Sequence, residues 1–181
     1  MTRVLTVFVC FSLFISVLSC KKRGCKTTYA INYDSSVQKD NNTCKYFYKT
    51  NVSAVKIMDF PDLDPNGMLW DDTSLPDLYI RFTNEVDEIK YQTTVISNIA
   101  SIDTVSWSFP SSVVVDSSAA ATQFKIYEVD DASARLIEKI SVDFKNYYHE
   151  SKTTLENDKY PDSVLFNSGG VSMMIYLNWI E

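Results

Sequence analysis

Histidine, glycine and proline are scarce in this chain of 181 residues, which holds one histidine, four glycines and five prolines. The single histidine, His149, excludes a His-rich metal site and an active site built on several histidines. The composition has no collagen-like or coiled-coil bias, and 45% apolar and 13% aromatic residues exclude a disordered chain. Basic residues form no concentrated stripe and the formal net charge is −6, so we expect no nucleic-acid partner.

Sequence motifs of common enzyme sites are missing as well. No Gly-Ser nucleophile elbow and no phosphate-binding glycine loop occurs. His149 is expected to be an exposed loop residue rather than a general base. Asp71 and Asp130 would suit a pair of glycosidase carboxylates, but nothing in the sequence sets their separation. We therefore predict that the protein is not an enzyme, with a hydrolase as the alternative.

The first 19 residues have the pattern of an export signal. Arg3 precedes an apolar stretch, Val4–Leu18, which is shorter than the roughly 20 residues that span a bilayer and fits the core of a secretory signal. The stretch ends at Ser19 and Cys20 and is followed by three basic residues. This segment resembles a bacterial lipobox, although Leu18 departs from its usual pattern. The resemblance implies that Cys20 carries the lipid, with an ordinary cleaved signal or a short anchor as alternatives.

Two cysteines remain for a disulfide, because Cys10 leaves with the signal and Cys20 is lipidated. An exported compartment permits a bond between Cys25 and Cys44, which would contribute about 3 kcal/mol by closing a loop of this size. The enclosed segment resembles a short module in surface proteins and lipoproteins of Bacteroidetes-type bacteria, and the matching residues are Gly24, Cys25, Ala30, Asn32, Tyr33, Asp40 and Cys44. The resemblance implies a spacer or a small oxygen-ligand loop. We expect residues 20–51 to form a lipidated tether and this module.

Short alternating segments follow from residue 52 to the end and predict about eight β-strands. The segments are 52–57, 78–82, 89–96, 107–115, 124–129, 136–144, 163–166 and 171–180. Pro110 interrupts one of them and indicates an edge or a bulge there. A loop or short helix is expected near residues 147–156. The pattern predicts an all-β protein, an antiparallel sandwich over residues 52–181.

Acidic residues gather at two presumed strand ends. The segment between Ile57 and Ile80 contains no base and six acids, namely Asp59, Asp62, Asp64, Asp71, Asp72 and Asp77. A second group, Glu128, Asp130 and Asp131, follows the strand 124–129. Charges of one sign repel unless solvent or a cation relieves them. In a sandwich the two groups can meet at one pole, where a hard cation finds oxygen ligands.

Residues 52–181 resemble a C2 domain on these motifs. Asp71 and the strand start Asp77–Ile80 are similar to the first calcium loop of that family, with Leu78 in place of its proline. Trp107 and Phe109 are similar to the tryptophan and phenylalanine of another segment in that family. Tyr127–Asp130 is similar to the third calcium loop, with a glutamate for its first aspartate, while Leu136 falls on the last ligand position. The resemblance implies a C2-like sandwich, calcium as the candidate cofactor, and the ligand set Asp71, Asp72, Asp77, Glu128, Asp130 and Asp131.

A second calcium loop is an alternative within the same acidic segment. Asp62-x-Asp64-x-Asn66-Gly67 resembles the opening of an EF-hand loop, but Thr73 stands where the bidentate glutamate belongs. We therefore interpret the pattern as a turn with acidic residues and keep the cation loop as the alternative. Trp70, beside these acids, is either a contact for a partner or a core residue.

These observations predict an exported lipoprotein of the outer membrane, on its periplasmic side or at the cell surface, and held to the membrane by its N-terminal lipid. The predicted function is a C2-like binding module that uses calcium to engage an unidentified envelope protein or glycan. The alternative is a structural or adaptor lipoprotein that has solvated acidic loops and needs no calcium.

Overall fold

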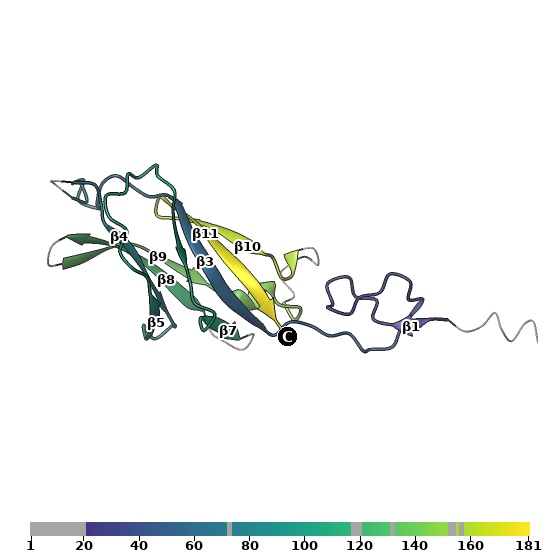
Figure 1. Cartoon of the computed structure of the whole chain (residues 1–181). Coiled ribbons are helices and arrows are strands. Elements are labelled where there is room, and N and C mark those ends of the chain that lie inside the picture. Colours follow the sequence, from purple (N-terminus) through teal and green to yellow (C-terminus); the bar gives the residue numbers. More distant parts are fainter. Residues whose placement is uncertain (1–20, 72–73, 117–120, 131–132, 152–154, 156–157) are drawn as a thin grey trace, which may run out of the picture. The chain divides into compact units, whose positions relative to one another are not determined.

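The computed structural model describes residues 21–71, 74–116, 121–130, 133–151, 155 and 158–181 (Figure 1). The signal segment with Cys20, and the predicted ligands Asp72 and Asp131, lie outside the described residues. The chain divides into two compact units between Tyr46 and Phe47. This division falls earlier than the predicted boundary after residue 51, because the first long strand already begins at Lys49. Each unit is described by itself below.

The first unit is a short looped segment closed by the disulfide between Cys25 and Cys44, which confirms the predicted pairing. Two short strands, β1 (Arg23–Gly24) and β2 (Lys39–Asp40), pair in parallel. Asn32 joins the two halves of the loop, since its side chain donates to the Thr43 carbonyl at 2.7 Å and accepts from the Lys45 amide at 2.8 Å. The asparagine of the predicted module therefore has a structural role.

The carboxylates of the first unit are engaged in local contacts. Asp34 lies 2.7 Å from the Lys22 ammonium and accepts from the Ser36 amide at 2.9 Å. The hydrogen bond from Lys22 is the largest cause that lowers the pKa of Asp34 to about 2. Asp40 accepts from the Asn42 amide at 2.8 Å, in a turn where Asn42 adopts a φ of 60°. Both acids thus stabilise turns of the module.

Nine strands of the described residues form the second unit, and their alternating burial explains why these segments are extended. They are β3 (Lys49–Asp59), β4 (Leu78–Thr83), β5 (Ile89–Gln92), β6 (Val105–Ser108), β7 (Val114–Asp116), β8 (Thr122–Asp130), β9 (Ser133–Val142), β10 (Ser163–Ser168) and β11 (Val171–Ile180). Each of the predicted segments coincides with one or two of these strands. A 3₁₀ helix, Phe144–Tyr147, follows β9.

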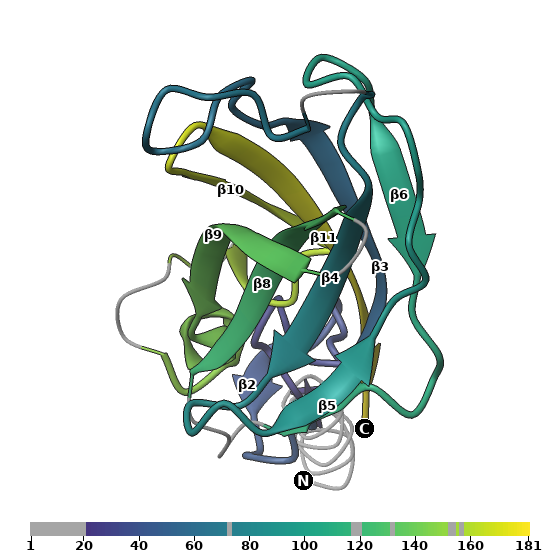
Figure 2. The same ribbon diagram turned by 90° about the vertical axis from the view of Figure 1, so that its left-hand side faces the viewer.

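The strands form two antiparallel sheets that face each other (Figures 1 and 2). One sheet has the order β10-β11-β3-β6, with β7 also paired to β3, and the other has the order β5-β4-β8-β9. Side chains from both sheets form one continuous core that includes Val55, Ile80, Phe124 and Ile175. This arrangement confirms the predicted all-β fold class, an antiparallel β-sandwich.

Pro110 separates two strands, as its position in the sequence predicted. β6 and β7 pair with successive parts of β3, and the chain leaves the sheet between them. The buried side chain of Asn51 fills this gap by donating to the carbonyls of Pro110 at 3.2 Å and Val113 at 3.0 Å. The Pro110 and Val113 carbonyls also accept the amides of Val113 and Val52, each at 3.0 Å, so Asn51 adds side-chain hydrogen bonds to a turn that the backbone already closes.

The segment after β9 packs on the core. Tyr148 is 2% exposed, and its hydroxyl donates to the Val115 carbonyl at 2.9 Å. His149 was expected to be exposed, but 16% of its side chain is accessible and its ring packs edge-on against Tyr48 at 5.4 Å. Burial lowers the pKa of His149 below its ordinary value. Across the described residues, helices long and apolar enough to span a membrane are absent.

Candidate functional site

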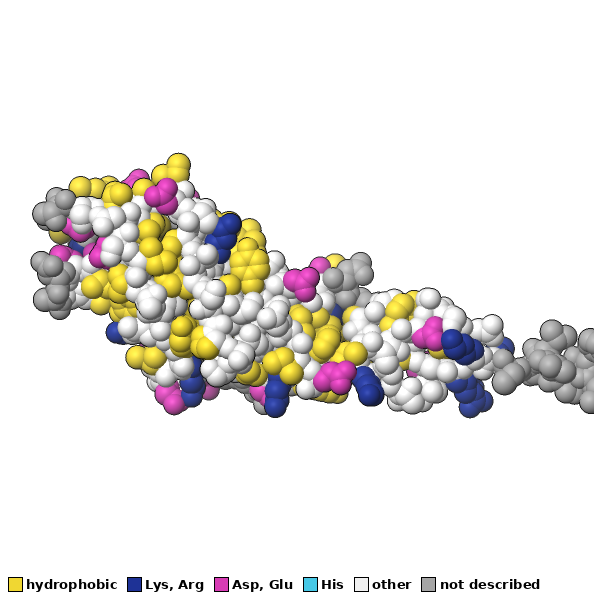
Figure 3. Space-filling model, viewed as in Figure 1, with side chains coloured by type: hydrophobic (Ala, Val, Ile, Leu, Met, Phe, Trp, Pro, Cys, Tyr) yellow, Lys and Arg dark blue, Asp and Glu magenta, His cyan; other side chains and the backbone are white. Residues whose placement is uncertain are grey.

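Three connections and the paired ends of two strands lie at one pole of the sandwich, which we call the acidic pole. The connections are the described parts of the loops 60–77 and 93–104 and the β10–β11 turn, and the strand ends are those of β8 at Asp130 and β9 at Ser133. The pairings Ser172 with Asp59, Ile57 with Val105, and Leu78 with Glu128 place the corresponding strand ends there. Acidic and hydrophobic side chains lie side by side at this end of the unit, on the left of Figure 3. The convergence that we expected from the sequence is therefore present.

Asp77 acts as the brace between two of these loops. Its carboxylate accepts from the Asn98 amide and from the Ser97 hydroxyl, each at 2.9 Å. The backbone continues the link, since the Ile99 amide donates to the Pro76 carbonyl at 2.9 Å. Asn98 adopts a φ of 60°, a conformation that the Asp77 contact helps to hold. Both oxygens of this predicted ligand are thus engaged within the protein.

Asp71 and Trp70 lie where loop 60–77 turns back toward β4. Asp71 accepts from the Ser74 amide at 3.1 Å and from the Ser74 hydroxyl. Trp70 is 3% exposed, and its indole nitrogen donates to the Pro61 carbonyl at 2.7 Å. Trp70 is therefore a core residue that closes the base of the loop, and its ring is not available as a contact surface.

Glu128 is the most deeply buried acid of the predicted set. It lies at the inner face of β8 with no exposed side-chain surface, and Arg135 donates from Nε to its Oε2 at 2.9 Å. The guanidinium also lies over the Trp70 ring, 5.6 Å from the ring centroid. The other carboxylate oxygen, Oε1, is buried without a hydrogen-bond partner among the described residues. The pole therefore carries a cation of its own, held between a carboxylate and an aromatic ring.

The charges of the pole influence one another. Burial raises the pKa of Glu128, Arg135 opposes the rise, and the nearby carboxylates of Asp130 and Asp71 add to it. The pKa of Asp64 is lowered, chiefly by the hydrogen bond from the Met68 amide and in part by Arg135. Asp71, Glu128 and Asp130 from the predicted ligand set are thus close enough to interact, with Arg135 among them.

A metal cluster is not formed by the side chains that the structure describes. Within those parts of the chain, no three His, Cys, Asp or Glu side chains lie in a position to hold a metal ion together. The EF-hand-like segment is a tight turn in which Asp64 Oδ1 accepts from the amides of Asn66 and Met68 at 2.8 and 3.0 Å. The turn interpretation of that motif is therefore the one that matches its geometry.

Arg135 is the residue that reasoning from the sequence missed. Arg135 lies directly opposite Glu128 in the ladder between β8 and β9, so the antiparallel register of the two strands brings the base and the acid together. Counting the acids at the strand ends overlooked this base, which is the third residue of β9. A shallow hollow of about 430 Å³, lined by Asp59 and residues 167–172, also belongs to the pole and was not anticipated.

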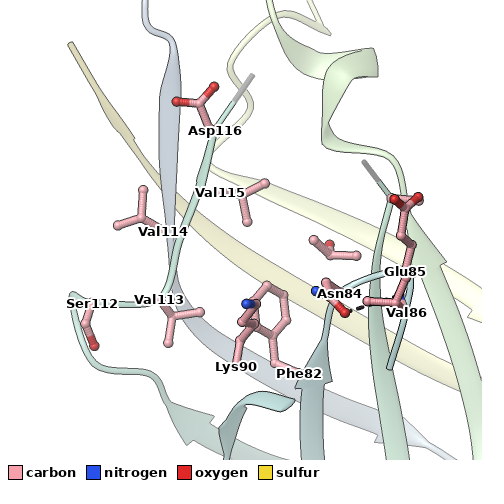
Figure 4. Close-up of a pocket in the computed structure, with 12 residues that line it drawn as sticks. Phe82, Asn84, Glu85, Val86, Lys90, Ser112, Val113, Val114, Val115 and Asp116 are labelled. Atoms are coloured by element: carbon pink, nitrogen blue, oxygen red, sulfur yellow. Dashed lines mark hydrogen bonds between the residues drawn. The ribbon is translucent and has the colours of Figure 1, made fainter. Parts of the chain in front are cut away.

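A second concave feature lies between the two sheets at the other pole (Figure 4). This cavity of about 480 Å³ is bordered by the β4–β5 turn, by residues 112–116 and by the start of β8. Figure 4 shows Val113 and Val115 on the side of their strand that faces Phe82, which makes the floor apolar. At the rim, Asn84 accepts from the Glu88 amide at 2.9 Å and Lys90 pairs with Glu88 at 2.6 Å. The polar rim thus stabilises its own turn.

Comparisons with known proteins give a distant structural likeness. No protein-family model and no curated protein matches the chain. A solved structure described as "Structure of a C2 domain" has a TM-score of 0.44 and 9% identity, and covers 73% of this chain and 97% of its own. Another, described as "CC2D1B coordinates ESRCT-III activity during the mitotic reformation of the nuclear envelope", has a TM-score of 0.38 and 12% identity, and covers 76% of this chain and 56% of its own. At these TM-scores neither structure assigns a family, a site or a function to this chain.

Proposed function

We propose that this protein is a non-catalytic binding module of the bacterial cell envelope, lipid-anchored through Cys20, which holds an envelope protein or glycan at its acidic pole. The observation that supports this most directly is the pole itself, where structured loops gather carboxylates around the guanidinium of Arg135. Binding residues commonly lie on loops that a rigid scaffold positions. The sandwich provides such a scaffold, since Asp77 and Trp70 fix the loops to it.

The proposed anchor is tested by acyl labelling. The full-length protein expressed in an exporting bacterial host with labelled fatty acid should carry the label, and Cys20→Ala should remove it. Cys25→Ala serves as the matched control, because Cys25 forms the disulfide and should leave the label in place. Label that persists in Cys20→Ala overturns the anchor.

We propose further that the pole works without calcium. Two of the predicted calcium ligands already have partners within the protein, and this supports the proposal. Asp77 accepts hydrogen bonds from Ser97 and Asn98, and Glu128 pairs with Arg135. Calcium dependence is the competing proposal, favoured by the proximity of Asp71 and Asp130 to Glu128. A calcium ion at this place would lie close to the guanidinium of Arg135, and the repulsion between the two positive charges opposes its binding.

Thermal unfolding distinguishes the calcium-independent proposal from the calcium-dependent one. At about 10 mM calcium, a site with the weak affinity of extracellular calcium modules would stabilise the native state by about 1.4 kcal/mol or more. We expect no change of the melting temperature between calcium, magnesium and chelator. A calcium-specific rise that Asp130→Asn abolishes would establish calcium dependence. Asp130 is the preferred variant because Asp77→Asn would also disturb the loop that Asp77 braces.

A non-catalytic role is supported by how the polar groups of both concave regions are used. At the acidic pole Asp71 and Asp77 accept hydrogen bonds and Glu128 pairs with Arg135. At the other cavity Asn84 and Lys90 stabilise their own turn. His149 packs against Tyr48 and pairs at 3.7 Å with Glu150. Turnover of chromogenic glycosides that is lost in both Asp71→Asn and Asp130→Asn would overturn this part of the proposal.

A further inference from the structure

A small hairpin, Asp62–Leu69, projects from the acidic pole, and we call it the apolar hairpin. Leu63 and Leu69 pair across it, and the Asp64 amide donates to the Met68 carbonyl at 2.7 Å. Gly67, with a φ of 80°, supplies the turn and donates to the Asp64 carbonyl at 2.9 Å. Phe60 and Trp70, both buried, fix its two ends in the core. The hairpin is therefore ordered before any partner arrives.

This ordered hairpin carries large apolar side chains in solvent. Leu63, Met68 and Leu69 are 46%, 57% and 55% exposed. On another loop of the same pole, Ile102 is 81% exposed at the tip of a turn that Asp103 closes by accepting from the Ala100 amide at 3.2 Å. Isolated exposed apolar side chains are ordinary, but three on one small ordered hairpin are typical of a surface that another molecule covers.

The charge around these side chains is almost wholly negative. The exposed carboxylates of Asp59, Asp62 and Asp103 belong to the pole, whereas the described residues of its loops 60–77 and 93–104 and of the β10–β11 turn contain no lysine or arginine. The base beside them is Arg135, which lies on β9. That base is already shared with Glu128 and lies against Trp70. A partner that covers the hairpin must therefore contribute positive charge around its own apolar groups.

We infer that the acidic pole docks a cationic segment of another protein, in which lysine or arginine side chains flank apolar ones. This inference rests on the proposed function and selects a protein over a glycan. The exposed groups are aliphatic and the Trp70 ring is buried, so the surface offers hydrophobic burial and carboxylates instead of an aromatic platform. An anionic bilayer is disfavoured because the same carboxylates repel its surface.

The test uses the mature protein and a fluorescent amphipathic peptide of leucine and lysine as the probe, followed by anisotropy. We expect saturable binding that weakens about tenfold or more in the double variant M68S/L69S. Val86→Ser is the matched control, because Val86 is 74% exposed at the other pole, and it should leave the affinity within about twofold. An equal loss in both variants, or no loss in M68S/L69S, overturns the inference.

A charge variant tests the inference independently of the hairpin's folding. The double variant D59N/D62N should weaken binding and flatten its dependence on salt, whereas Glu85→Gln at the other pole should do neither. Unchanged salt dependence in D59N/D62N contradicts the inference. A second result would also contradict it: the protein binds phosphatidylcholine vesicles, with or without phosphatidylglycerol, and M68S/L69S abolishes that binding. This result would show that the hairpin contacts a bilayer.

Failure of this inference can be told from failure of the proposed function. Site-specific cross-linking in the intact envelope, from a photoreactive group at position 102, reports any molecule at the pole. A cross-linked glycan at that position, with no binding of the peptide, overturns the cationic protein partner and keeps the binding module. If a group at position 102 forms no cross-links but a group at position 86 does, the partner binds at the other pole. That result overturns both the inference and the proposal that the acidic pole is the binding site.

Discussion

Arg135 holds Glu128 in the interior of the acidic pole: the guanidinium Nε lies 2.9 Å from a carboxylate that has no exposed surface, and 34% of the arginine side chain remains accessible. The pair joins β8 to β9 at the end of the core, and it places a permanent cation among carboxylates that come from distant parts of the chain. The relationship determines both the stability of this pole and its response to pH.

Removing Arg135 should lower stability more than removing a base that pairs with an exposed carboxylate. Arg135→Ala leaves Glu128 buried and unpaired, so we expect the free energy of unfolding to fall by about 2 to 4 kcal/mol at neutral pH. Lys125→Ala is the control, because Lys125 pairs with the exposed Asp87 on the outer face and should cost no more than about 1 kcal/mol. Urea unfolding measures both. Equal losses in the two variants would show that the burial of Glu128 carries no penalty.

Stability should fall as pH rises through the range in which Glu128 ionises. Burial raises its pKa above the ordinary value of 4.5, so the native state binds this proton more tightly than the unfolded chain. The free energy of unfolding therefore decreases as pH rises from about 4.5 toward the pKa of the folded state and is level above it. Glu128→Gln should remove this decrease, and Arg135→Ala should steepen it. Urea midpoints measured from pH 4 to pH 8 test the sign, and an unchanged profile in Glu128→Gln would contradict it.

Reduction of the disulfide should loosen the first unit and leave the sandwich intact. Opening the Cys25–Cys44 loop removes about 3 kcal/mol of stabilisation on the chain-entropy estimate. Hydrogen exchange with and without reductant is the measurement. The Ile31 amide, bonded to the Lys45 carbonyl, should lose protection, while the Val55 amide in β3 serves as the internal control. Retained protection at Ile31 after reduction would show that the module does not depend on its disulfide.

The buried hydroxyl of Tyr148 should contribute measurably to the second unit. Tyr148→Phe removes the hydrogen bond to the Val115 carbonyl, and we expect a loss of about 1 kcal/mol in urea unfolding. Tyr176→Phe is the matched control, because Tyr176 is 38% exposed on β11 and its substitution should change stability by less than about 0.5 kcal/mol. A neutral Tyr148→Phe would mean that packing alone holds this segment.

Much of the fold could be predicted from local pattern. Alternation of apolar and polar residues depends on the period of a strand, which is why the segments around Ile80, Ile126 and Ile175 were recognised. Pro110 lacks an amide hydrogen, so the break between β6 and β7 also followed from the sequence. The disulfide was predicted from the two cysteines that remain once Cys10 is assigned to the signal segment and Cys20 to the expected lipid anchor.

The sequence by itself determined that the chain is a β-protein with a cysteine-closed segment before it, and that acids would gather at strand ends. Only the tertiary structure decided how those acids are used. Asp77 braces a loop that follows it by some twenty positions, Trp70 turns into the core, and Glu128 meets Arg135 across a ladder. These outcomes depend on contacts between side chains and loops that the alternation of apolar and polar residues does not encode, because their free energies come from burial and pairing in three dimensions.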